Sequence, residues 1–263
     1  MLYHAKNGRI AGTDYIRFGT GNRTLVILPG LGDGLQTVQG TALPMAWMYR
    51  MFARDFTVYM FSRKSSLPRG HSTRDMARDL KETMDALDIR QADLLGVSMG
   101  GMIAQWLAID YPQKVGRLIL AVTSSRPNEI LTASIEEWLQ QAHNKDHRAL
   151  MVSNMRKIYS EGYCRKNGWM VPILGVVTKP KSYERFLIQA EACLTHDAFS
   201  HLSVIGSPTL VIGGACDNAL GPEASREIAG QIPGAQLKMY PQWGHGLYEE
   251  AADFNQLVYD FLK

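Results

Sequence analysis

Residues 92–101 read Ala-Asp-Leu-Leu-Gly-Val-Ser-Met-Gly-Gly, and this stretch decides the fold. An apolar run typical of a buried strand ends at Val97, and a helical pattern rich in Ala, Met and Leu begins at Ser98. The two meet in the pattern Gly-x-Ser-x-Gly, which places a serine on a sharp turn between a strand and a helix. Such a turn strains the serine backbone, and glycine flanks it at Gly96 and Gly100 because larger side chains would clash. Ser98 is therefore a candidate nucleophile.

Short apolar runs alternate with helical patterns on both sides of this turn. Continuous apolar runs are typical of strands that are covered on both faces. The alternation predicts an α/β fold, with a mostly parallel central sheet flanked by helices. Strands are predicted over 24–28, 56–61, 92–97, 115–122, 209–212 and 236–240, after a hairpin within 2–18, and helices over 73–87, 98–109, 130–142, 183–194 and 251–262.

The alternation breaks after residue 125, and the sequence up to His201 is helical and poor in strands. Strand patterning resumes at Thr209, and a parallel sheet has to be completed. We therefore interpret residues 126–201 as a helical cap inserted into a core domain of residues 1–125 and 202–263. The alternative is a second, independent domain.

One histidine is placed to activate the serine, whose hydroxyl is a poor nucleophile without a base. His245 lies in a glycine-flanked loop after the strand 236–240, at the sheet edge where open α/β sheets bind ligands. The base needs a carboxylate to hold its tautomer, and Asp217 directly follows the strand 209–212. The resulting order, Ser98, Asp217, His245, is the one that the pattern requires.

Three other carboxylates compete with Asp217 for this role. Asp253, Glu249 and Glu250 all follow His245 in the chain, which is the wrong order, and we interpret them as solvated helix charges.

Acyl transfer also needs two donors for the developing oxyanion. The backbone N–H of Met99 is one candidate, and the other is Leu31, with Gly32 as its alternative, in the loop 29–34. Glycines in this loop could instead form a flexible turn or a phosphate loop. The phosphate loop lacks support, because neither a Lys-Ser/Thr ending nor a G-x-G-x-x-G spacing is present.

Several residues are candidates for substrate binding. Gly30 and Gly32 belong to the predicted oxyanion loop. The side chains of Trp138, Tyr163, Trp169 and Met170 could line an apolar acyl pocket under the cap or could equally form the core of the cap.

Composition excludes several classes of protein. The 28 basic and 25 acidic residues give a net charge of +3, too small to indicate a nucleic-acid partner. Three cysteines are too few and odd in number to form a disulfide framework. Residues 1–8 contain no apolar leader. No apolar run approaches the ~20 residues that are needed to cross a bilayer. We expect a cytoplasmic protein that does not interact with membranes.

Two histidines at i and i+4, His143 and His147, could hold zinc on one helix face. The glutamate of the H-E-x-x-H pattern is missing and no third ligand is evident, so no metal and no cofactor are predicted.

Taken together, these motifs resemble the α/β-hydrolase superfamily, in the branch that contains esterases, enol-lactonases and carbon–carbon bond hydrolases. The resemblance covers the chain except for the insertion, which corresponds to the family's cap. This sequence differs from the family pattern at Pro29, where a histidine usually precedes the oxyanion loop. It also differs at residues 62–72, which are longer than the usual Asp-x-Arg-Gly-x-Gly-x-Ser. The matching stretches are 29–32, 69–72 with 76–80, 96–101, 205–217 and 244–245.

The resemblance implies a Ser98–His245–Asp217 triad, an acyl-enzyme and a small or medium uncharged carboxylic ester, thioester or lactone as substrate. Serine at position 98 argues against the dehalogenase branch, which uses aspartate. Two alternatives remain: another reaction on the same triad, such as carbon–carbon bond hydrolysis, a lyase step or perhydrolysis, or a non-catalytic homologue that senses a ligand. The sequence leaves open whether the protein forms a homodimer.

Overall fold

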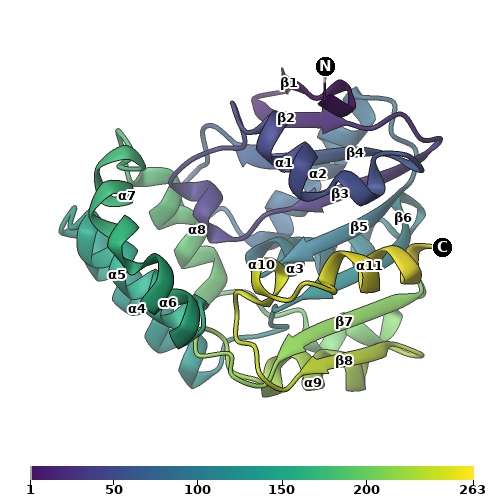
Figure 1. Cartoon of the computed structure of the whole chain (residues 1–263). Helices are drawn as coiled ribbons and strands as arrows, with labels where there is room; N and C mark the ends of the chain where they lie inside the picture. Colours follow the sequence, from purple (N-terminus) through teal and green to yellow (C-terminus); the bar gives the residue numbers. More distant parts are fainter. Residues whose placement is uncertain (1) are drawn as a thin grey trace.

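The computed structural model describes residues 2–263, apart from the side chains of residues 2, 174 and 177. All strands of this part of the chain belong to a single sheet, which helices cover (Figure 1). The strand order is β1-β2-β4-β3-β5-β6-β7-β8. The first two pairings are antiparallel and the others are parallel, so the expected α/β class is confirmed. The strands are β1 (Lys6–Ile10), β2 (Thr13–Phe18), β3 (Arg23–Leu28), β4 (Phe56–Lys64), β5 (Ala92–Val97), β6 (Val115–Ala121), β7 (Thr209–Gly214) and β8 (Gln236–Tyr240).

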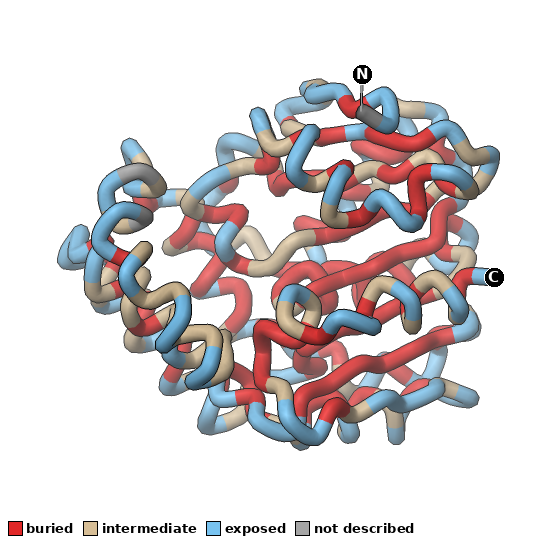
Figure 2. Tube along the Cα trace, viewed as in Figure 1, coloured by how far each residue is buried: buried red, intermediate tan, exposed pale blue. Residues whose placement is uncertain are grey.

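Apolar residues at alternate positions of each central strand pack against opposite layers of helices. Val26 and Leu94 belong to the cluster that contains α2 (Thr73–Ala86) and α3 (Met99–Asp110). Ile27 and Leu95 belong to the cluster on the other face, with α1 (Ala42–Met48) and α11 (Phe254–Leu262). Because successive side chains of a strand point to opposite faces, a strand that is apolar throughout is buried on both. Figure 2 shows the central strands as buried along their length.

The chain between β6 and β7 is helical, and its helices lie beyond one end of the sheet strands (Figure 1). Helix α8 packs back onto the core, where it contacts the short 3₁₀ helix η2 (Leu31–Gly34). The helices of this insertion are α4 (Glu129–His143), α5 (His147–Ile158), α6 (Glu161–Asn167), α7 (Val171–Val177) and α8 (Glu184–Leu194).

The sequence pattern missed or misplaced several elements. β4 continues to Lys64 instead of ending at residue 61, and its polar residues Ser62 and Arg63 are buried inside the protein. The helix predicted from residue 251 begins only at Phe254, as α11. Helices α1, α5, α6, α7, α9 (Glu223–Gln231) and the short α10 (Leu247–Glu250) were not predicted.

The carboxyl ends of β3, β5, β7 and β8 lie at the same edge of the sheet, because these strands are parallel. The loops that follow them carry Leu31, Ser98, Asp217 and His245, so the topology brings the predicted site together. None of the helices in the described part of the chain combines the length and apolarity needed to cross a membrane.

Candidate active site

Ser98 lies on a strained turn between β5 and α3. Its φ of 55° and ψ of −123° are rare for a residue with a side chain. The surrounding backbone holds this conformation: the Ser98 N–H donates to the Ala121 carbonyl at 2.9 Å, and the Thr123 hydroxyl donates to the Ser98 carbonyl at 2.7 Å. A Cβ at Gly100 would lie 2.1 Å from the Leu28 carbonyl oxygen, so only glycine lets the helix approach β3 this closely.

The three residues predicted to form the triad lie within hydrogen-bonding distance. His245 Nε2 is 3.0 Å from Ser98 Oγ, and His245 Nδ1 is 2.9 Å from Asp217 Oδ2. The other carboxylate oxygen, Oδ1, accepts from the backbone N–H groups of Ala219 and Leu220, both at 2.9 Å. Asp217 and His245 are each only 4% exposed. This arrangement can remove a proton from Ser98 and stabilise the resulting imidazolium.

The loops that carry Asp217 and His245 are joined to each other. The Cys216 N–H donates to the Trp243 carbonyl at 3.1 Å. Gly214 allows this approach, since a Cβ there would lie 2.4 Å from the same carbonyl oxygen. The acid and the base are thus held by two loops with a fixed separation.

The two predicted oxyanion donors lie where their N–H groups have no acceptor within a helix. Met99 is the first residue of α3, and Leu31 is the first residue of η2. Between Leu31 and the serine lies Gly30, where a Cβ would be 3.3 Å from Ser98 Cβ and 3.7 Å from Oγ. The space beside the nucleophile therefore depends on the absence of a side chain at Gly30.

Replacing Gly30 with alanine is expected to lower kcat/KM for an ester by at least about tenfold, a loss of ~1.4 kcal/mol in transition-state stabilisation. The added methyl would occupy space beside Ser98 that the reacting carbonyl needs. The matched control is Gly32→Ala in the same loop, where a Cβ would meet nothing within 4 Å. Steady-state kinetics of the two variants check this, and equal losses in both would contradict the role given to Gly30.

A buried ionic cluster that the sequence did not reveal holds the same loop. Arg63 Nη2 donates to the Pro29 carbonyl at 2.6 Å, so a side chain from β4 anchors the residue that stands where the resemblance leads us to expect histidine. Arg185 of α8 donates through Nη2 to Asp33 Oδ2 and through Nη1 to the Asp33 carbonyl, both at 2.6 Å. Burial lowers the pKa of Arg63, while the Asp33 carboxylate opposes this effect. The oxyanion loop, β4 and the insertion thus meet at one carboxylate.

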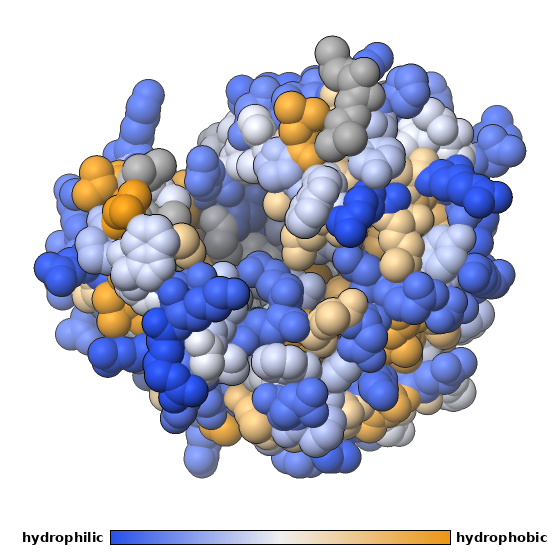
Figure 3. All heavy atoms as spheres, viewed as in Figure 1, coloured by the Kyte–Doolittle hydropathy of each residue, from blue (hydrophilic) through white to orange (hydrophobic). Residues whose placement is uncertain are grey.

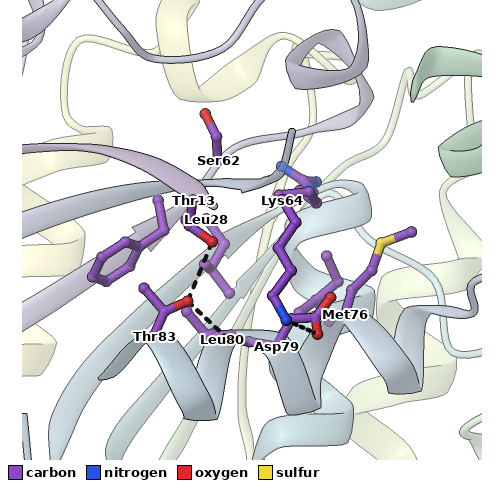
Figure 4. Close-up of a pocket in the computed structure, with 11 residues that line it drawn as sticks. Thr13, Leu28, Ser62, Lys64, Met76, Asp79, Leu80 and Thr83 are labelled. Carbon is purple, nitrogen blue, oxygen red and sulfur yellow. Dashed lines mark hydrogen bonds and ion pairs between the residues drawn. The ribbon is translucent and has the colours of Figure 1, made fainter. Parts of the chain in front are cut away.

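A small cavity lies beside this cluster, between the sheet and α2 (Figure 4). Its volume is about 20 Å³, which is room for one water molecule. Lys64 bonds Asp79 on one side of it and Thr13 contacts Thr83 on the other, as Figure 4 shows. The cavity is too small for a substrate.

A larger cavity of about 440 Å³ contains Ser98 and His245. It lies between the core and the insertion, where the space-filling view shows a recess (Figure 3). Among the predicted substrate-binding residues, the lining includes Gly30, Gly32 and Trp138, and it also includes Leu31, the predicted oxyanion donor. Further apolar side chains line it from both sides: Leu35, Met45, Met48, Met60, Met151, Met155, Ile158, Val171 and Phe186.

The structure does not bring Tyr163, Trp169 and Met170 to this cavity. Trp169 is 67% exposed on the surface of the insertion. Tyr163 stacks on Tyr159 with ring centroids 4.2 Å apart, and only Tyr159 lines the cavity. Helical periodicity could not be assigned in this stretch, so the sequence could not show which aromatic residues face inward.

Four polar or ionisable residues of the cavity wall were missed or misread. Tyr49, Tyr159 and Tyr248 line the cavity from α1, α5 and α10, each at or just beyond a helix end. Glu249, interpreted from the sequence as a solvated helix charge, is exposed as expected, but it also lines the cavity and accepts a hydrogen bond from Tyr159 at 2.8 Å. Its position four residues after His245 is the one signal that could have indicated a place near the site.

The histidine pair considered for zinc is not on one helix face. His143 ends α4 and His147 begins α5, where its Nε2 lies 3.0 Å from the Thr178 hydroxyl. Within residues 2–263 as described, no group of three or more His, Cys, Asp or Glu side chains is arranged to hold a metal ion.

Comparison with known proteins identifies the family of this chain. The family model described as the alpha/beta hydrolase fold matches residues 23–252. The 2-hydroxy-6-oxononadienedioate/2-hydroxy-6-oxononatrienedioate hydrolase of a Pseudomonas species is 28% identical over 193 residues, which cover 71% of this chain and 68% of that protein.

Two solved structures share the architecture over nearly the whole chain. One is MGS-M2, an alpha/beta hydrolase enzyme from a Medee basin deep-sea metagenome library, with a TM-score of 0.83, 22% identity and coverage of 98% of this chain and 97% of that one. The other is the enol-lactonase from Burkholderia xenovorans LB400, with a TM-score of 0.80, 23% identity and coverage of 98% and 99%.

Proposed function

The chain belongs to the α/β-hydrolase fold family, and we propose that it acts as a serine hydrolase on a carboxylic ester, thioester or lactone of small or medium size. The observation that carries this proposal is the continuous path of contacts from Ser98 Oγ through His245 to Asp217, at 3.0 and 2.9 Å. The path opens into a cavity of about 440 Å³, within the range that holds small-molecule substrates.

In the proposed reaction, Ser98 Oγ attacks the substrate carbonyl while His245 Nε2 takes its proton. Asp217 accepts the hydrogen bond from Nδ1–H and stabilises the imidazolium. The N–H groups of Met99 and Leu31 bind the oxyanion of the tetrahedral intermediate. The imidazolium then protonates the leaving alcohol or thiol, and a water molecule, deprotonated by His245, releases the acid from Ser98.

A second candidate is hydrolysis of a carbon–carbon bond, because the Pseudomonas relative is named for that class of substrate. A dienedioate carries two carboxylates, and their recognition calls for arginine or lysine. Of the described residues that line the cavity, none is lysine or arginine. This charge distribution favours the ester, thioester or lactone.

Labelling with a fluorophosphonate tests the proposed function. We expect one covalent adduct per chain, located at Ser98 by peptide mass spectrometry, and no adduct in Ser98→Ala. The labelled protein should lose all hydrolysis of a p-nitrophenyl ester series from acetate to octanoate. Labelling that persists in Ser98→Ala, or a wild-type protein that neither labels nor cleaves any ester while it cleaves a dienedioate, would reject the proposal in favour of the alternative chemistry.

A further inference from the structure

We infer that the cavity contains a subsite for a cation, formed by Glu249 together with Tyr49, Tyr159 and Tyr248, and that the substrate carries an ammonium group. This inference rests on the proposed function, since it assigns a substrate class to the same cavity. It also departs from the uncharged substrate that the sequence led us to expect.

Glu249 is the carboxylate that gives the cavity its negative charge. Its one described side-chain partner is the neutral phenol of Tyr159, and within the described part of the chain no lysine, arginine or histidine forms an ion pair with it. The other carboxylate in the lining, Asp33, is 1% exposed at its side chain and is neutralised by Arg185 at 2.6 Å. A ligand in this cavity therefore meets one carboxylate without a counter-ion.

Burial raises the pKa of Glu249, and the neighbouring Glu250 raises it further, while the hydrogen bond from Tyr159 opposes both effects. The surrounding protein displaces part of the water from this carboxylate although the residue remains exposed, and partial desolvation disfavours the charged form. A cation bound beside Glu249 would reverse this effect, since an opposite charge favours the ionised carboxylate. The charged carboxylate and a cationic ligand thus stabilise each other.

Three tyrosine rings complete the proposed subsite. Tyr49, Tyr159 and Tyr248 line the same cavity as Glu249. Burial, and then the charge of Glu249, raise the pKa of both Tyr49 and Tyr248, so their phenols stay neutral and add no charge of their own. Aromatic faces attract cations, and a carboxylate that shares a cavity with such rings suits an alkylammonium group, whose apolar substituents can pack on the rings.

Hydrogen bonds between the insertion and the core hold Tyr159 in place. The Gly246 N–H donates to the Ile158 carbonyl at 2.6 Å, and the Ser160 N–H donates to Glu250 at 3.1 Å. Glu250 thus fastens Ser160, on one side of Tyr159, and Gly246 fastens Ile158 on the other, whereas the adjacent Glu249 remains available to a ligand. The two neighbouring glutamates therefore have different roles.

Binding to a protein that cannot turn over substrate tests the subsite directly. In Ser98→Ala, isothermal titration calorimetry should show that butyrylcholine binds about tenfold more tightly than 3,3-dimethylbutyl butyrate, which has carbon in place of the ammonium nitrogen. Adding Glu249→Gln should remove most of the difference, because glutamine can still accept from Tyr159 but carries no charge, so that only the attraction of the tyrosine rings remains. The matched control is Glu223→Gln, whose side chain is 81% exposed, and it should leave the tenfold preference unchanged.

The outcomes separate this inference from the proposed function. Equal affinity for the two esters, or no binding of butyrylcholine at millimolar concentration, overturns the subsite even if Ser98 hydrolyses other esters. A preference that Glu249→Gln leaves undiminished also overturns it. If wild-type protein fails to hydrolyse either ester but the charge-dependent preference is present, the proposed function fails and the subsite stands.

The preference should also depend on pH. Below its raised pKa, Glu249 is protonated and carries no charge, so the affinity ratio of the two esters should be smallest in acid and grow as the pH rises through that pKa. Taking the ratio cancels the pH effects that both esters share. The ionisable groups that influence Glu249 are Tyr49, Tyr159, Tyr163, Tyr248 and Glu250. A ratio that is independent of pH would count against the subsite.

Discussion

Replacing Ser98 with alanine is expected to lower kcat for ester hydrolysis by about 10⁶-fold, with little change in KM. The variant keeps the cavity and both proposed oxyanion donors but lacks the proposed nucleophile, so His245 has no hydroxyl to activate. The substrate still binds, because alanine removes one oxygen from a cavity of about 440 Å³. Steady-state kinetics on a p-nitrophenyl ester, with active-site titration to measure wild-type contamination, give the value.

Two further variants make this result specific. Asp217→Asn is expected to lower kcat by about 10⁴-fold, because the amide cannot hold the same imidazole tautomer or stabilise its charged form. Ser200→Ala, at an exposed position of the insertion's last segment, should leave kcat unchanged. The loss of a nucleophile should leave far less than about a hundredth of wild-type activity. If Ser98→Ala keeps more than that, another group must carry the reaction.

Replacing Asp33 with alanine is expected to lower the free energy of unfolding by about 3–5 kcal/mol. The change leaves the guanidinium groups of Arg63 and Arg185 without their shared carboxylate, and Arg63 is buried. Removing one partner of a buried ion pair is costly because the remaining charge can regain neither its partner nor water. Urea unfolding followed by circular dichroism measures the loss, which is a large part of the 5–15 kcal/mol typical of a domain.

An exposed ion pair provides the control for Asp33→Ala. Glu161 pairs with Arg165 on α6, and the two side chains are 94% and 77% exposed. Glu161→Gln should change the free energy of unfolding by less than about 0.5 kcal/mol, because solvent screens such pairs. A decrease in the free energy of unfolding below about 1 kcal/mol for Asp33→Ala would contradict this description of Arg63 and Arg185. Contributions that small are typical of ion pairs at the solvent-exposed surface.

Local pattern was sufficient to predict the core of the fold. The strands predicted at 92–97 and 236–240 agree with β5 and β8. The first is apolar except for Asp93 and is buried throughout, and the second is bounded by the turn residues Gly234 and Pro241. The residues Ser98, Asp217 and His245 could be chosen for the same reason, since each follows one such strand. Helix α1 escaped prediction because Pro44 stands inside it and its seven residues are too few to show a helical period.

The cavity wall could not be predicted, because it is made by contacts between distant parts of the chain. Glu249 meets Tyr159 across 90 residues, and Arg185 meets Asp33 across 152. From the sequence, charged residues at such positions are expected to face solvent. The neighbouring residues are alike for a glutamate that lines a cavity and for one on the open surface, so they cannot distinguish the two. The insertion was the hardest part to interpret, as the placement of Trp169 on the surface shows.

The separation of 147 residues between Ser98 and His245 has a consequence for how the protein acquires activity. The serine turn needs only neighbouring strands, whereas the base arrives after β7 and β8 have paired, following the whole insertion. Contacts that are distant in sequence close late, because the entropy of the intervening loop must be lost first. During refolding, helical content therefore returns before turnover does, and enzymatic activity reports the completion of the sheet.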